Sequence, residues 1–157
     1  MKKILAVVML LVLALGLTAC GGGDAAETTT MTAREMYDEI LMAAPMNAPQ
    51  ELDDTMLNDL FYVDPALTEE YVAAIALMNV SSDNLAVIKA TEGNAEKVAE
   101  GLQQRADDVA MTFERYLEDQ YVKAQNALII TKGDWVFMAI NDDYEAVEEA
   151  INGFFGK

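Results

Sequence analysis

The longest periodic stretch of the chain, from about Asn94 to Tyr121, constrains its fold more than any other feature. Apolar or aromatic side chains recur there at steps of three and four, at Val98, Leu102, Ala106, Val109, Phe113, Tyr116, Leu117 and Tyr121. This spacing predicts one long amphipathic helix with an acidic outer face. The apolar face of such a helix has to pack on another apolar layer.

Two pairs of apolar runs flank this helix and predict β-hairpins. Before it, residues 70–78 are apolar on both alternating faces, and residues 85–90 follow after a polar turn. After it, residues 127–131 and 135–140 are joined by a turn around Gly133. We expect strands in all four runs, although the alanines of residues 70–78 leave a helix there as an alternative.

Three shorter helices complete the expected fold. Thr32 and Glu35 have the spacing of a capping box at the start of the first. The second spans about residues 51–61, and the third follows a cap at Asp142 with Glu145 in a capping-box position. The expected order is α-α-β-β-α-β-β-α. This is an α+β fold in which a small, mostly antiparallel sheet packs on one long helix.

The first residues are typical of a segment that is removed from the mature protein. Lys2 and Lys3 precede an apolar run of about a dozen residues, which is shorter than the roughly 20 residues of a membrane-spanning helix. The run ends in Leu17-Thr18-Ala19-Cys20, the pattern of a lipobox, in which Cys20 is acylated and becomes the first mature residue. An ordinary secretory signal with an unmodified Cys20 is the alternative. We expect a signal peptide (1–19), a lipidated flexible tether (20–31) and one α+β domain (32–157).

The charge of the mature chain excludes several partners. The whole chain has 10 basic and 27 acidic residues, and removal of Lys2 and Lys3 leaves 8 − 27, or −19. Nucleic acid and anionic lipid headgroups would repel such a protein. There is no histidine, and Cys20 is the only cysteine. Catalysis by a nucleophile paired with histidine, and zinc binding, are therefore not expected, and we expect no cofactor.

Several features together resemble DUF4358, a family of bacterial lipoproteins. They are the lipobox, the apolar strand before Met78-Asn79, the run from Leu85 to Lys89, Arg105 in the long helix, Tyr116 with Gln120, and Gly133 between two strands. The resemblance covers roughly residues 65–155 and the signal. It implies a location and an architecture, but no activity and no catalytic residues.

Two groups of residues are candidate sites. Asn141, Asp142, Asp143 and Glu145 bring four oxygen-bearing side chains to a helix start, and oxygen ligands suit calcium. Helix capping explains the same residues without a metal. Arg105, Tyr116 and Trp135 lie at the margins of apolar faces and are candidate ligand contacts, with Arg105 as a planar donor to an anion.

The function expected from these features is non-catalytic. A lipoprotein anchored to the outer face of a bacterial membrane through Cys20 would bind an envelope protein or a cell-wall component. Two alternatives are a solute- or calcium-binding lipoprotein and a glycan hydrolase that uses two of the many carboxylates.

Overall fold

A five-stranded antiparallel sheet between two layers of helices forms the protein, as described by a computed structural model for residues 29–155. The strands are β1 (Pro49–Glu51), β2 (Thr68–Ala76), β3 (Asn84–Ala90), β4 (Leu128–Lys132) and β5 (Trp135–Ile140), in the order β1-β2-β3-β5-β4. The expected α+β class with a small antiparallel sheet is confirmed. The signal peptide, Cys20 and most of the tether lie outside the described residues.

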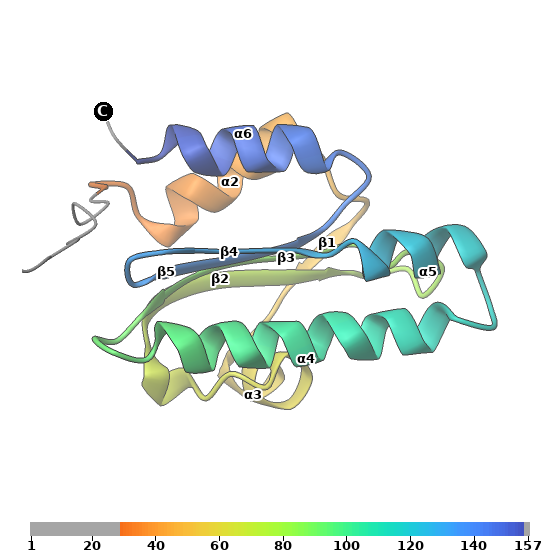
Figure 1. Cartoon of the computed structure of the whole chain (residues 1–157), viewed down its shortest axis with the longest axis horizontal. Helices are drawn as coiled ribbons and strands as arrows, with labels where there is room; N and C mark the ends of the chain where they lie inside the picture. The colour runs from red at the N-terminus through yellow and green to blue at the C-terminus, as the bar shows by residue number, and fades with distance from the viewer. Residues whose placement is uncertain (1–28, 156–157) are drawn as a thin grey trace, which may run out of the picture.

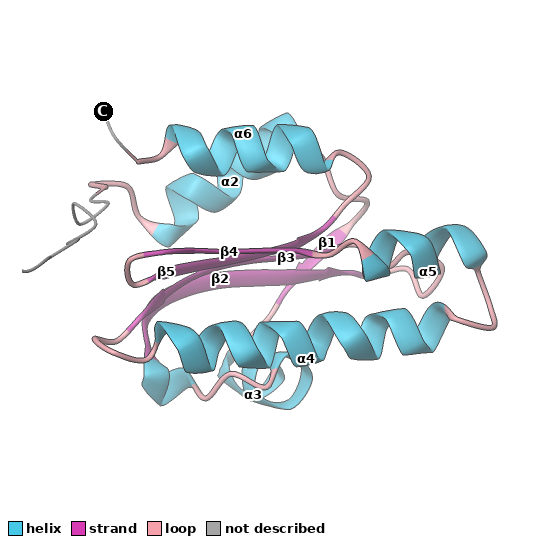
Figure 2. Cartoon of the chain, in the orientation of Figure 1, coloured by secondary structure: helices cyan, strands magenta, loops and turns pink. Residues whose placement is uncertain are grey.

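Helices cover both faces of the sheet (Figures 1 and 2). On one face lie α2 (Ala33–Ala43) and α6 (Tyr144–Gly153). On the other lie α3 (Asp54–Phe61), a short 3-10 turn (Pro65–Leu67) and the long α4 (Ala95–Phe113), with α5 (Glu118–Gln125) at the end of α4. We expected one long helix to cover the sheet, and the structure adds a second layer.

Burial on both faces explains the continuous apolar runs in the central strands. Along β5 every residue is buried, with Val136 and Met138 facing α4 and Phe137 facing α2 and α6. The same alternation in β2 sends Ala73 to one core and Val72 to the other. Residues 70–78 are therefore strand up to Ala76, and the helical alternative is wrong.

The predicted single helix over residues 94–121 is wrong, because it is two helices in the structure. The chain turns after Phe113, whose carbonyl oxygen accepts hydrogen bonds from the amides of Tyr116 and Leu117. The apolar spacing continues through this turn because α5 also has an inward face, at Leu117, Tyr121 and Ala124. Periodicity alone therefore could not reveal the break.

A second difference lies between α2 and α3. Residues 49–51 form β1, an edge strand that pairs with residues 74–76 of β2. We expected a helix from about residue 51, but α3 begins at Asp54 with Asp53 as its cap, where the carboxylate accepts the Met56 amide. The capping box of Thr32 and Glu35 at the start of α2 is confirmed.

Candidate binding site

The strongest candidate site is a pocket at the end of the sheet where the β2–β3 loop lies beside the C-terminal half of α4. Its volume is about 340 Å³, which is at the small end of the range for ligand pockets. Its apolar lining comes mainly from Ile75, Leu77, Met78, Val109 and Phe113. Polar lining is supplied by Asn79, Ser81, Ser82, Asp83, Asn84, Arg105 and Thr112.

Arg105 is the only lysine or arginine among the described residues that line this pocket. Its Nε donates a hydrogen bond to Oδ1 of Asn84 at 2.9 Å, and its guanidinium carbon lies 5.3 Å from the centre of the Phe61 ring. Within residues 29–155 no carboxylate forms an ion pair with it, and its terminal Nη groups have no acceptor. Burial lowers the pKa of Arg105, and electrostatic interactions with Asp108 and Tyr62 partly offset this effect.

The helix α3 packs against α4 and fixes the position of Arg105 through Phe61. Gly101 of α4 allows the close approach, since a Cβ there would lie 2.6 Å from the carbonyl oxygen of Tyr62. Tyr62 ends α3 in the left-handed region, with φ 56°, and its hydroxyl donates a hydrogen bond to Asp108. The approach of α3 therefore places Phe61 against Arg105, and Tyr62 hydrogen-bonds Asp108, a carboxylate that interacts electrostatically with Arg105.

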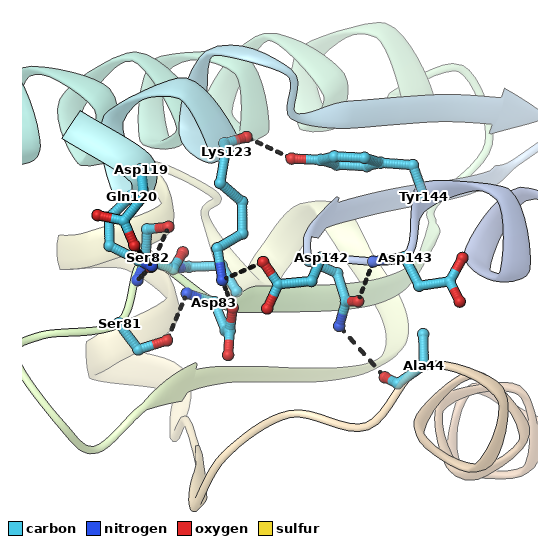
Figure 3. Close-up of polar contacts among 12 residues, drawn as sticks. Ala44, Ser81, Ser82, Asp83, Asp119, Gln120, Lys123, Asp142, Asp143 and Tyr144 are labelled. Atoms are coloured by element: carbon cyan, nitrogen blue, oxygen red, sulfur yellow. Dashed lines mark hydrogen bonds and ion pairs between the residues drawn. The ribbon is translucent and has the colours of Figure 1, made fainter. Parts of the chain in front are cut away.

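Polar side chains of α5 hold the β2–β3 loop in place (Figure 3). The side-chain oxygen of Gln120 accepts hydrogen bonds from the backbone amide and the hydroxyl of Ser82, at 2.9 and 3.1 Å. The side-chain Nδ2 of Asn84 donates to the Ser82 carbonyl, and its side-chain oxygen accepts from Arg105. The loop is thus tied to α5 and to α4 at consecutive positions.

A buried ion pair lies next to these bonds. Nζ of Lys123 is 2.7 Å from Oδ1 of Asp83 and 3.0 Å from Oδ1 of Asp142 (Figure 3). The side chains of Lys123 and Asp83 are only 6% and 4% exposed, whereas that of Asp142 is 82% exposed. Burial alone would lower the pKa of Lys123, but the two carboxylates outweigh it and raise that pKa. Asp83 is the only acid among the described residues that line the pocket, and Lys123 neutralises it.

Three of the four candidate metal ligands, Asn141, Asp142 and Asp143, have other roles in the structure. The buried Asn141 donates to the Ala44 carbonyl and accepts from the Asp143 amide, while Asp142 pairs with Lys123. The cap of α6 is Asp143, whose carboxylate accepts the Ala146 amide, so our assignment of that cap to Asp142 is wrong. Glu145 consequently does not occupy a capping-box position. In the described part of the chain, no group of three or more His, Cys, Asp or Glu side chains could hold a metal ion.

Arg105, Tyr116 and Trp135 do not form one site. Tyr116 is exposed in the turn between α4 and α5. Trp135 is buried in the core beneath α2 and α6, on the opposite face of the sheet from α4, with its ring near Phe137 and Lys89. Only Arg105 of the three lines the pocket.

Sequence analysis did not identify the partners of Arg105 or the buried ion pair. Asp83 and Asn84 belong to the polar turn expected between residues 70–78 and 85–90. Gln120 is named only with Tyr116 in the family resemblance, and no role is expected for Lys123. One signal was present: Gln120 and Lys123 are three residues apart, which places them on one face of a helix. The residues that they contact are about 40 positions earlier in the chain. The sequence alone does not show that these two segments lie side by side in the fold.

A second hollow between α4 and α5 has a different character. Asp107 and Glu114 line it together with Gln103, Gln125 and Tyr121, and the described residues of its lining include no cation. It is therefore part of the acidic surface, and the Arg105 pocket is the more distinctive feature.

The fold and the pocket together define a small antiparallel α+β domain with a pocket at one end of its sheet. The family model described as "Domain of unknown function (DUF4358)" matches residues 42–141, so the chain belongs to this family. The matched segment includes the whole sheet, the pocket and the buried ion pair. No curated protein and no solved structure matches the chain.

Proposed function

We propose that this chain is a lipoprotein on the extracytoplasmic face of a bacterial membrane, where its domain binds an envelope protein or a cell-wall component without catalysis. The observation that carries the binding role is the Arg105 pocket, because it combines uncommitted hydrogen-bond donors with an apolar lining. The anchor rests on the lipobox pattern that ends at Cys20.

Exposed apolar side chains around the same end of the molecule support a binding role. Leu77, Met78 and Val80 of the β2–β3 loop are 66%, 53% and 45% exposed. Tyr116 and Val122, in the neighbouring α4–α5 turn and in α5, are also exposed. Clustered apolar exposure beside a pocket is typical of surfaces that bind partners.

The position of the chain's described start also supports this proposal. The N-terminal end of α2 lies at one end of the molecule, whereas the β2–β3 loop and α5 lie at the other (Figure 1). A tether at residues 20–31 would join the domain at the end remote from the pocket. Attachment at that end would leave the pocket accessible to a partner. Among residues 29–155, no helix is long and apolar enough to cross a bilayer.

A photo-crosslinking residue placed at Met78 tests the binding role in cells. We expect a discrete covalent adduct from position 78 and its loss when Arg105→Gln is added. Met42, an exposed methionine of α2 that does not line the pocket, is the matched control position. Equal labelling from positions 42 and 78, or no adduct from positions 77, 78 and 80, would contradict the proposed binding surface.

The anchor is tested separately with Cys20→Ala. We expect the wild-type chain in the membrane fraction with a fatty-acyl group on residue 20, detected by mass spectrometry. The variant should carry no acyl group and should be absent from the mature, membrane-bound protein. An unmodified Cys20 in the wild-type protein would contradict lipidation.

A further inference from the structure

We propose that the Arg105 pocket binds a single carboxylate group carried on a short apolar chain, such as the C-terminal residue of a peptide or a small carboxylic acid. This inference rests on the proposed binding function and specifies its ligand. The guanidinium would hold the carboxylate, and the apolar lining would cover the attached carbon atoms.

The geometry of Arg105 leaves the correct donors available. Asn84 accepts only from Nε, and the Phe61 ring lies beside the guanidinium, so the two terminal Nη groups remain without partners among the described residues. Two parallel N–H donors in a fixed plane match the two oxygens of a carboxylate. An arginine held in this way loses little side-chain freedom when it binds an anion.

Most other polar groups of the lining are already engaged. The Thr112 hydroxyl donates to the Asp108 carbonyl, and the Ser82 hydroxyl donates to Gln120. Asp83 is neutralised by Lys123. The guanidinium is therefore the principal charged donor left for a ligand.

Charge favours a monoanion over a phosphate or a polyanion. The pocket offers one positive charge, and the chain as a whole has a formal charge of −17 before any processing. A dianion would leave one negative charge unpaired in a strongly negative field. One carboxylate instead balances one guanidinium.

The size and lining of the pocket limit the attached group. A volume of about 340 Å³ accommodates one or two residues of a peptide rather than a folded surface. Ile75, Val109 and Phe113 form an apolar wall, so a branched or aromatic terminal side chain would gain most from burial there.

Fluorescence anisotropy with the full chain in detergent tests the ligand class. The probes are short fluorescein-labelled peptides ending in Ala, Leu or Phe, each prepared with a free C-terminal carboxylate and as the C-terminal amide. We expect at least one carboxylate probe to bind and its amide to bind at least about tenfold more weakly. Competition by isovalerate would identify a small acid as a sufficient ligand. Binding without such competition would identify a peptide terminus.

Three variants separate a loss of recognition from a loss of folding. Arg105→Gln should lower the affinity for the carboxylate probe at least about tenfold and leave the weak affinity for the amide probe unchanged. Arg105→Lys keeps the charge but not the planar pair of donors, so we expect an intermediate loss. Arg115→Gln, at an exposed arginine outside the pocket lining, makes the same charge change and should bind as wild type. Circular dichroism melting of each variant reports folding.

Equal affinity for acid and amide, no binding by any carboxylate probe, or an equal effect of Arg105→Gln and Arg115→Gln would overturn the proposed ligand class. If position 78 still gave its Arg105-dependent adduct in cells, the binding function would stand and only the ligand class would be wrong. Loss of that adduct as well would overturn both.

Discussion

Tyr37 is a buried tyrosine with an unusual hydroxyl. The residue is 1% exposed in the core between α2 and the sheet, and its hydroxyl is the one buried side-chain polar atom without a hydrogen-bond partner in residues 29–155. A buried hydroxyl without a partner costs stability because it has lost its bonds to water.

Tyr37→Phe should therefore raise the free energy of unfolding by about 1 kcal/mol, because it removes an unsatisfied group and keeps the ring. Urea denaturation followed by circular dichroism measures the change. Tyr144→Phe is the matched control, since the Tyr144 hydroxyl donates to the Lys123 carbonyl, and that variant should lose stability. A loss of stability in Tyr37→Phe would show that its hydroxyl is satisfied in solution.

Lys123 gives the second residue-scale prediction. Lys123→Met leaves the buried carboxylate of Asp83 without its cation, and we expect a loss of about 3 kcal/mol in the free energy of unfolding. Asp142→Asn removes only the exposed partner and should cost under about 1 kcal/mol. Chemical denaturation of both variants measures this difference, and equal losses would contradict a dominant role for the buried pair.

The close contact between α3 and α4 at Gly101 leaves no room for an added carbon atom. Gly101→Ala would place a Cβ within 3.0 Å of two backbone oxygens, those of Phe61 and Tyr62, and backbone cannot move aside as a side chain can. We expect a loss of about 1–3 kcal/mol in the free energy of unfolding, together with weaker ligand binding because Phe61 would move away from Arg105.

Gly153→Ala is the matched control for this substitution. Gly153 also lies in a helix, at the end of α6, but nothing is within 4 Å of a Cβ built there. Alanine favours the helix more than glycine does, so the free energy of unfolding should rise by up to about 1 kcal/mol. Thermal melts of the two variants should shift in opposite directions, and equal shifts would show that close packing at Gly101 is not the cause.

Elements with a local signal could be predicted from the sequence. The Thr32–Glu35 capping box, the Gly133 turn and the apolar runs of β3 and β5 all depend on neighbours within a few positions, and each is confirmed. The edge strand β1 could not be predicted, because it depends on pairing with residues 74–76 of β2. The break after Phe113 was hidden because the apolar spacing continues through the turn into α5.

The same distinction applies to the candidate site. The position of Arg105 near the edge of an apolar helix face could be read from spacing, and the structure places it in the pocket. Its role depends on Asn84 and Phe61, which are 21 and 44 positions away in the sequence, and on the absence of a nearby ion pair. No local pattern encodes those three conditions.

At the scale of the whole molecule, tyrosine ionisation sets an alkaline limit to stability. Burial raises the pKa of Tyr37, Tyr71 and Tyr144 from 10.0 to about 12, with nearby carboxylates contributing to the shift. A pKa that is higher in the folded state means that folding favours the protonated phenol. This contribution is complete below pH 10 and is lost as the pH rises towards 12.

We therefore expect the free energy of unfolding to fall between pH 10 and pH 12, as measured by urea denaturation at a series of pH values. The triple Phe variant at these positions should show a shallower fall over the same range. A free energy that stays constant or rises across this window would contradict the assignment.

The order of strands in the sheet has a consequence for how the protein folds. The two hairpins, β2–β3 and β4–β5, are local, but the central β3–β5 pairing joins residues about 50 positions apart and has to close a long segment that contains α4. Arg105 lies in that segment, and its hydrogen bond to Asn84 joins α4 to β3. The pocket joins the β2–β3 hairpin to α4, so a chain that has formed only its hairpins has no pocket with which to recognise a ligand.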